Sequence, residues 1–211
     1  MAVGDARFGC GYPGPHRAEP SSTDALERAV DDSVVTCIRL APVVYALLSK
    51  LFVRDGRTLA IVADDGQATL DGGGSVGPLL TSSRGADVVL ANLRLRNGNS
   101  TGSSTGSGGA VFNYPDGTME MRTCAFDDNH AKWGGAVCND RGTMVMRTCT
   151  FDHNHATAHG GAVYDIEGTV EMHACAFDGN HAGFLGGAVY DIEGTMAVHD
   201  CTFTDCSAEV L

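Results

Sequence analysis

The sequence predicts an all-β fold, a single-stranded parallel β-helix (solenoid) of about six coils with a short N-terminal capping helix. Three observations predict it. The phrase GGAVYDIEGT occurs at 160–169 and again at 186–195, so a unit repeats every 26 residues. Apolar residues largely alternate in TVEMHACAF, which indicates a half-buried strand. Glycine contributes 28 of the 211 residues and proline only 6, which is typical of a repeat structure and not of disorder.

Four copies of the 26-residue unit follow one another at 108–133, 134–159, 160–185 and 186–211. Each copy predicts three short strands, as in GAVY, TVEM and ACAF, separated by the glycine, asparagine, aspartate or histidine that turns require. A propeller blade would need about 40–50 residues and four strands, so one coil of a β-helix fits better. Successive coils then lie about 4.8 Å apart, with equivalent residues directly above one another.

Equivalent residues should therefore form files along the solenoid. The predicted inward aromatic file is Phe126, Phe151, Phe177 and Phe203. An inward cysteine file, expected as free thiols that pack like small hydrophobic residues, is Cys124, Cys149, Cys175 and Cys201. A third file is expected at a turn, where the residues have left-handed backbone and their side-chain amides stack. Its members are Asn129, Asn154 and Asn180.

The region before the regular repeats predicts three segments. Residues 1–20 are expected to be a flexible segment, 21–49 a cap with a short helix, and 50–211 the β-helix. Residues 24–32, DALERAVDD, have one apolar side and predict the helix, with Asp24 as N-cap and Glu27 three residues later. The glycine- and serine-rich stretch 97–109 predicts a flexible surface loop between coils.

The net charge and the hydropathy of the chain restrict the classes of partner that it can bind. The net charge of −12 excludes the basic footprint of a nucleic-acid-binding protein. The most apolar stretch is interrupted by Arg39, Pro42 and Lys50, so no membrane-spanning segment is expected. No signal peptide is apparent, so the compartment stays open, although free thiols would fit a reducing one.

The combination of GGAV with FDDN, FDHN and FDGN resembles the GGA(I/V) and FxxN repeats of chlamydial polymorphic outer membrane proteins. It is also similar to the wider group of right-handed parallel β-helix proteins with the pectin-lyase-like fold. The resemblance covers roughly residues 50–211 and implies right-handed coils. The chlamydial proteins are surface adhesins that carry a signal peptide and a membrane domain, and neither is expected in this chain. The last copy departs from the motif, because Cys206 stands where asparagine is expected.

The pectin-lyase-like group includes polysaccharide lyases and glycoside hydrolases that use carboxylates on one face of the coil. The periodic acids of this chain are Asp127, Asp152 and Asp178 and, separately, Asp165, Glu167, Asp191 and Glu193. Because an active site usually breaks a repeat and these acids follow it, we interpret them as solvated outward positions.

Metal binding is a weaker alternative for several periodic residues. Stacked carboxylates would favour Ca²⁺, which makes Asp127, Asp152 and Asp178 weak candidates for metal ligands. Imidazoles could bind Zn²⁺ or Ni²⁺, but the repeated histidines are expected to stack as surface turn residues. These histidines are His130, His155 and His181, with His153 and His159 nearby in one coil.

The sequence therefore predicts a non-enzymatic β-solenoid that acts as a structural or binding module for glycans or protein surfaces. No catalytic residue and no cofactor are expected. Trp133, Phe184 and Leu185 lie in predicted inter-coil loops, where they would stack on sugar rings or tuck onto the coil. Edge-to-edge self-association at the C-terminal coil is a further expectation.

Two other functions remain open at this point. A carbohydrate-active enzyme would need basic residues among the acids, and the repeats offer only Lys132, Arg122, Arg141 and Arg147. Ice binding would need flat threonine ladders, and the threonines repeat in a single file.

Overall fold

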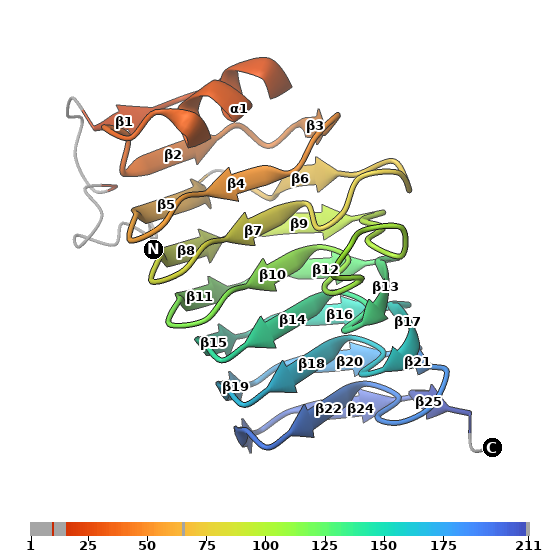
Figure 1. Ribbon diagram of the computed structural model, residues 1–211. Coiled ribbons are helices and arrows are strands. Elements are labelled where there is room, and N and C mark those ends of the chain that lie inside the picture. The colour runs from red at the N-terminus through yellow and green to blue at the C-terminus, as the bar shows by residue number, and fades with distance from the viewer. Residues whose placement is uncertain (1–9, 11–15, 65, 210–211) are drawn as a thin grey trace.

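The computed structural model describes residue 10 and residues 16–64 and 66–209, so most of the predicted flexible segment 1–20 lies outside the described residues. The chain forms a parallel β-solenoid of about seven turns. The turns stack from the N-terminal helix to the C-terminal strands (Figure 1). The sequence predicts about six, because the first turn lacks the repeated motifs.

Four parallel sheets build the solenoid, and neighbouring strands in each of the following sets pair with one another. Sheet A contains β1 (Arg17–Ala18), β2 (Cys37–Leu40), β5 (Thr58–Ala63), β8 (Asp87–Ala91), β11 (Thr118–Arg122), β15 (Thr143–Arg147), β19 (Thr169–His173) and β23 (Thr195–His199). Sheet B contains β3 (Val44–Ala46), β6 (Ala68–Asp71), β9 (Leu93–Arg96), β12 (Ala125–Asp127), β16 (Thr150–Asp152), β20 (Ala176–Asp178) and β24 (Thr202–Thr204). Sheet C contains β4 (Leu51–Val53), β7 (Leu80–Ser82), β10 (Val111–Asn113), β14 (Val137–Asp140), β18 (Val163–Ile166) and β22 (Val189–Ile192). Sheet D contains β13 (His130–Trp133), β17 (His155–His159), β21 (His181–Ala182) and β25 (Ser207–Ala208).

The structure differs from the sequence prediction in two places along this path. Strands β2 and β3 already pair within sheets A and B, so the solenoid begins before residue 50. Each later copy also has a fourth strand, in sheet D, which the sequence prediction lacks. In β13 and β17 the first buried residue is only an alanine, Ala131 or Ala156, and the flanking histidines look like turn residues.

The interior is filled by files of equivalent side chains. The rings of Phe126, Phe151 and Phe177 stack with nearly parallel planes, at centroid distances of 4.8 and 4.6 Å. Phe203 continues the stack 4.8 Å beyond Phe177 but is 49% exposed, because it lies on the last turn. Cys124, Cys149, Cys175 and Cys201 carry free thiols, as the sequence predicts. A disulfide that the repeat pattern does not predict joins Cys10 to Cys37 of β2.

The asparagine file lies inside the solenoid. Asn129, Asn154 and Asn180 are fully buried, and each side-chain amide donates to the next asparagine or to a backbone carbonyl. The expected left-handed backbone is wrong for these residues. It belongs instead to the residue before each of them, such as His153 with a φ of 50°. That residue turns the chain, which leaves the asparagine to point inward and satisfy the carbonyls of the corner.

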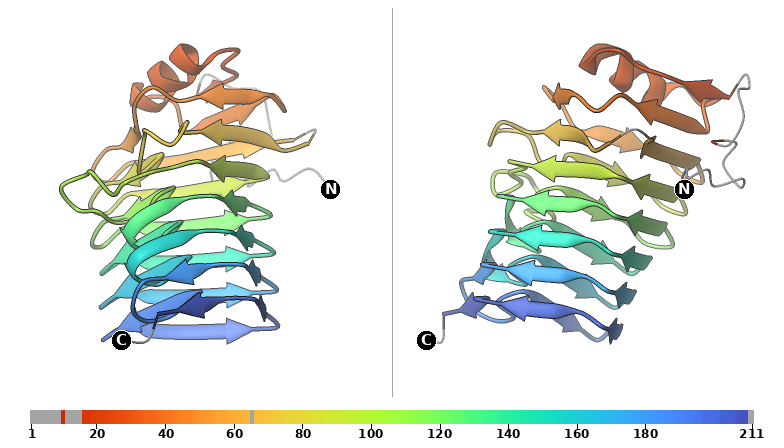
Figure 2. Two further views of the ribbon diagram at one scale, coloured as in Figure 1. Left: turned by 90° about the vertical axis from the view of Figure 1, so that its right-hand side faces the viewer. Right: turned by 180° about the vertical axis from the view of Figure 1, so that it is seen from behind.

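One helix, α1 (Thr23–Asp31), covers the N-terminal end of the stack (Figure 2). Its N-cap is Ser22 and not Asp24, because the Ser22 hydroxyl accepts from the amide of Ala25. Leu26, Ala29 and Val30 are the buried side of the helix. Within the described residues, no helix has the length and apolar character needed to cross a membrane.

Candidate functional site

An open groove of about 400 Å³ lies on the outward face of sheet C, beside the 97–109 loop. Its lining comes from β10, β13, β14 and β18 and from the loop. Aromatic side chains form much of the lining, and charged groups stand at the rim. The lining residues are Thr105, Ser107, Phe112, Trp133, Cys138, Asp140, Arg141, Tyr164, Ile166 and Glu167.

The floor of the groove follows from the two-residue period of a strand. Val111, Val137 and Val163 are fully buried in the interior, so the next residue on each strand faces outward. These outward residues are in register across the turns, and the file runs through Phe112, Cys138, Tyr164 and Tyr190. The Tyr164 and Tyr190 rings are stacked with centroids 5.9 Å apart. The repeat thus generates an aromatic strip with one cysteine in it.

Trp133 forms a wall of the groove. It is the last residue of β13 and not part of a loop, which corrects the sequence prediction. Backbone hydrogen bonds hold the 97–109 loop against it. The amide of Gly108 donates to the Trp133 carbonyl at 2.9 Å, and the amide of Lys132 donates to the Gly106 carbonyl at 2.7 Å. The Lys132 ammonium lies 4.1 Å from the Trp133 ring centroid. The other two aromatic or apolar candidates, Phe184 and Leu185, are about half exposed at the neighbouring corner.

Charged groups mark the rim at the turn after β14 and at the turn after β18. Arg141 pairs with the carboxylate of Asp140, with Nε 2.8 Å from Oδ1. The hydrogen bond and the charge of Asp140 raise the pKa of Arg141. Glu167 occupies the equivalent turn position one coil later, and both Arg141 and Glu167 have left-handed backbone. The rim therefore offers both signs of charge to a bound polar molecule.

The groove offers no activated nucleophile among its titratable floor residues. Burial raises the pKa of the Cys138 thiol, which keeps it neutral near pH 7. Burial, with the neighbouring Cys138 and Tyr190, also raises the pKa of Tyr164. The arrangement suits recognition by stacking and hydrogen bonding better than covalent chemistry.

Away from the groove, the three weak metal candidates form one file on sheet B. Asp127, Asp152 and Asp178 are in register. The solvated interpretation is wrong for Asp127, which is buried, whereas Asp178 is exposed. Asp127 already pairs with Arg94, its Oδ2 2.5 Å from Nε, and Asp152 contacts His153 at 2.6 Å. Burial raises the pKa of Asp127, although Arg94 opposes the shift.

The outward interpretation of the second set of acids is wrong for Asp165 and for Asp191, which is in register with it. Asp165 is fully buried and belongs to an inward polar file of sheet C. The links of this file are Ser82 to Asn113 at 2.5 Å, Asn113 to Asn139 at 2.7 Å and Asn139 to Asp165 at 2.7 Å. The next residue in register is Asp191. Burial and the neighbouring Asp191 raise the pKa of Asp165 to about 6. Glu167 and Glu193 are exposed, as predicted.

The repeated histidines stack along sheet D. His155 lies between His130 and His181, with ring centroids 5.6 and 5.2 Å away. Burial and the two flanking imidazoles lower the pKa of His155. His159 instead stacks on Tyr190 at 4.9 Å, beside the groove.

Residues 123–140 and 148–165 each match the Chlamydia polymorphic membrane protein repeat. The chain is therefore a parallel β-helix in which two segments are similar to this repeat, called the Pmp-like repeat below. Each matched segment runs from the turn before sheet B to sheet C, so the matches include Phe126 and Phe151 of the aromatic file and Cys138 and Tyr164 of the groove floor. No curated protein and no solved structure matches the chain.

Proposed function

We propose that this protein is a non-enzymatic binding module that takes a glycan in the groove on sheet C. The observation that carries the proposal is the pair of partly exposed aromatic side chains, Tyr164 and Trp133, beside the nearly buried Phe112. Asp140, Arg141 and Glu167 border them. Aromatic faces suit the apolar faces of sugar rings, and the rim groups suit their hydroxyls. We also assign the solenoid to the pectin-lyase-like group, on the support of its parallel sheets and Pmp-like repeats.

The spacing of the strip supports a repetitive ligand. Tyr164 and Tyr190 present nearly parallel rings from consecutive turns, and their planes differ by 7°. A polysaccharide presents similar rings at regular intervals along its length. Because these two rings stack on each other with centroids 5.9 Å apart, a ligand lying along the strip would contact their edges and hydroxyl groups, without requiring a unique residue in any one turn.

The test is a glycan array followed by calorimetry on the best ligand, using the whole chain. Trp133→Ala and Tyr164→Ala should each weaken binding at least about tenfold, as expected for aromatic residues at the centre of a site. The matched control is Phe52→Ala, because Phe52 belongs to the same outward file but lies two turns upstream, outside the groove lining.

Two results would overturn the proposal. One is the absence of glycan binding, or binding that neither groove variant weakens. The other is release of reducing ends or unsaturated products from the bound polysaccharide, which would favour the carbohydrate-active alternative with Asp140 or Glu167 at the rim.

A further inference from the structure

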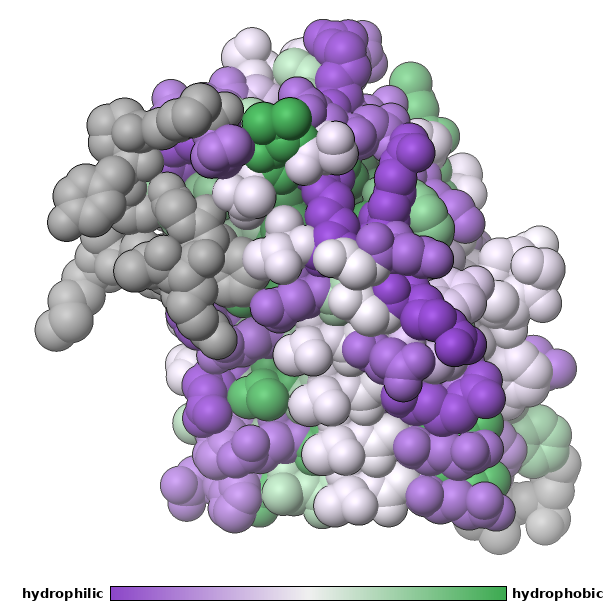
Figure 3. All heavy atoms as spheres, turned by 60° about the vertical axis from the view of Figure 1, so that its left-hand side comes forward, coloured by the Kyte–Doolittle hydropathy of each residue, from purple (hydrophilic) through white to green (hydrophobic). Residues whose placement is uncertain are grey.

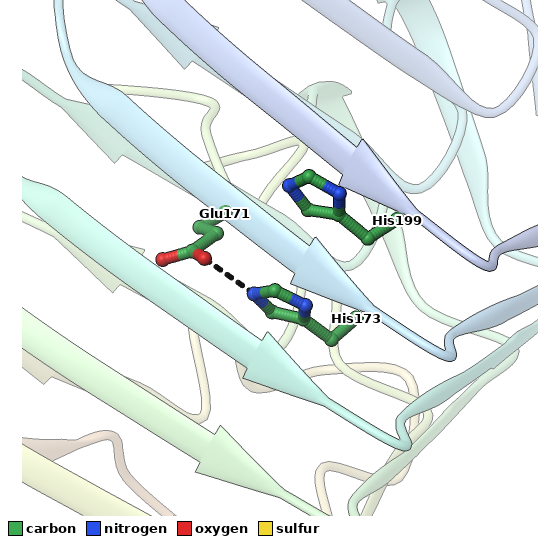
Figure 4. Close-up of side chains that lie close together, drawn as sticks. All are labelled: Glu171, His173 and His199. Carbon is green, nitrogen blue, oxygen red and sulfur yellow. Dashed lines mark hydrogen bonds and ion pairs between the residues drawn. The ribbon is translucent and has the colours of Figure 1, made fainter.

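We propose that Glu171, His173 and His199 form a zinc-binding site on the outward face of sheet A. Among the described residues, these three bring their ligand atoms within 4.8 Å of one another. Figure 4 shows Glu171 and His173 joined by a hydrogen bond, with the ring of His199 beside them on the neighbouring strand. The site lies on a different sheet from the groove and does not depend on the proposed function.

The register of the parallel strands assembles the group. Glu171 and His173 are two residues apart on β19, so both side chains point to the same face. His199 is the direct partner of His173 on β23, and their rings stack at 4.8 Å. Two positions on one strand and one on the next therefore give a triangle of ligands.

The repeat breaks at this site. The file that contains His173 and His199 carries Arg122 and Arg147 in the two preceding turns. There the arginines pair with the Glu120 carboxylate, at 2.7 Å for Arg122 and 3.8 Å for Arg147. In the last two turns, imidazoles replace these permanent cations, and a neutral imidazole can bind a metal where a guanidinium cannot.

The surroundings leave room for an ion. Ala197 is the partner of Glu171 on β23, so only a methyl group stands beside the carboxylate on that side. His199 is exposed, and Glu171 and His173 are partly exposed, so solvent reaches all three. The net charge of −12 attracts cations to the surface in general. Figure 3, which shows one side of the molecule, is dominated by hydrophilic and near-neutral residues, so outward positions on that side are well hydrated.

The ligand distances need only a small adjustment. Zinc binds imidazole nitrogen and carboxylate oxygen at about 2.0–2.2 Å, so two of its ligand atoms in tetrahedral geometry lie about 3.3–3.6 Å apart. The present atoms lie within 4.8 Å, and rotation of the exposed His199 side chain can close the difference. The Nε2 atom of His173 already points at the Glu171 carboxylate, and the ion would replace the shared proton.

The chemistry of the donor set favours zinc over calcium. Two imidazoles and one carboxylate are borderline ligands of the kind that zinc prefers, whereas calcium takes oxygen ligands. Three protein ligands also leave the fourth tetrahedral position to water or to an external ligand.

The test is zinc titration of the untagged whole chain by calorimetry, with imidazole resonances followed by NMR. The wild type should bind zinc at one site that shifts the His173 and His199 resonances. His173→Ala, His199→Ala and Glu171→Gln should each weaken that site at least about tenfold, given that even supporting partners of metal ligands contribute 10–100-fold. His155→Ala and Cys201→Ser are matched controls for the sheet D histidines and for the partly exposed thiol, and both should bind as the wild type does.

Three results would overturn the proposal: no zinc uptake by the wild type, unchanged affinity in His199→Ala, or loss of the zinc-dependent shifts in His155→Ala or Cys201→Ser. Because His199 is exposed on the last strand of sheet A, its substitution leaves the buried core intact.

Discussion

The two ends of the solenoid are built differently. At the N-terminal end, α1 covers the first turns, and Leu26 and Val30 are almost completely buried. At the C-terminal end of the described chain, the last turn shows its interior side chains, with Phe203 49% and Val198 46% exposed. Figure 2 shows both ends of the stack.

The covered end is also tied down by polar contacts. The guanidinium of Arg57 donates to the carbonyls of Asp32 and Val35 at 2.6 and 2.7 Å, and to that of Val30 at the end of α1. The buried Tyr45 hydroxyl donates to the Pro20 carbonyl at 3.0 Å. Equivalent residues in different copies therefore do not contribute equally to the free energy of unfolding. The contribution of each depends on whether another turn or a cap covers it.

The largest expected effect is a loss of stability when a phenylalanine in the middle of the aromatic file is truncated, compared with one at its end. Phe151→Ala should reduce the free energy of unfolding by about 3–5 kcal/mol, because Phe151 is 1% exposed between two rings. Phe203→Ala should reduce the free energy of unfolding by less than about 1 kcal/mol, because half of its side chain already contacts water. Urea unfolding measures both, and equal losses would contradict the comparison.

A second effect concerns the attachment of the cap. Arg57→Ala should reduce the free energy of unfolding by about 2–4 kcal/mol, because charged hydrogen bonds contribute about 1.5–3 kcal/mol each and their carbonyls would lose a partner. Arg54→Ala is the matched control, since Arg54 makes an exposed ion pair with Asp31 that should contribute at most about 1 kcal/mol. Thermal unfolding of both variants would test this, and equal changes in stability would show that Arg57 does not hold the cap.

The polar file of sheet C gives a pH-dependent contrast. In the earlier turns its members are Asn113 and Asn139, and in the turns nearer the C-terminal end they are Asp165 and Asp191. Burial foremost, and then Asp191, raise the pKa of Asp165 from 3.8 to about 6, so folding favours its protonated form. The stability of the wild type contributed by this group is present below about pH 4 and is lost as the pH rises through about 6.

Asp165→Asn should therefore stabilise the protein at pH 7.5 by about 1–3 kcal/mol, at 1.36 kcal/mol per pKa unit. The new amide group would take the place of the Oδ2 atom, which is buried without a partner. The difference from the wild type should shrink towards pH 4. Urea unfolding from pH 4 to 7.5 measures it, and a difference that does not change with pH would contradict the raised pKa.

The smallest expected effect is association between copies through the uncovered end. Because α1 covers the other end, two copies would meet through their C-terminal turns, where Ile192, Val198 and Phe203 are exposed. Val198→Lys should lower the association constant while changing the unfolding free energy by no more than about 1 kcal/mol, because only half of the side chain is buried. Sedimentation velocity over a concentration series measures this, and a wild type that stays monomeric throughout would refute it.

The fold was predictable because the repeat has a fixed length and the strands pair in parallel register, so equivalent residues occupy the same position in every turn. The positions of Phe151 and Asn154 follow directly from the repeat. The buried position of Asp165 also follows from the two-residue alternation after Val163, and the asparagines at the same place in earlier copies, such as Asn139, were the available signal. It was missed because an aspartate beside Glu167 resembles a solvated turn.

The two sites were harder to predict because neither lies within one copy of the repeat. The groove needs Trp133 from sheet D, the floor of sheet C and an inserted loop, and no local pattern joins them. The Glu171, His173 and His199 group is formed across two turns. Its signal is the change from arginine to histidine along one file, which appears only when the copies are aligned strand by strand.

Amide hydrogen exchange tests the contrast between the two ends most directly. The amide of Ala60 donates to the Thr36 carbonyl at 2.9 Å near the covered end, and that of Thr202 donates to the Cys175 carbonyl at 3.0 Å in the last turn. With hydrogen bonds of similar length, any difference in protection reports how easily each turn opens. Exchange should be at least about tenfold slower at Ala60 than at Thr202. Equal protection at the two amides would contradict the account.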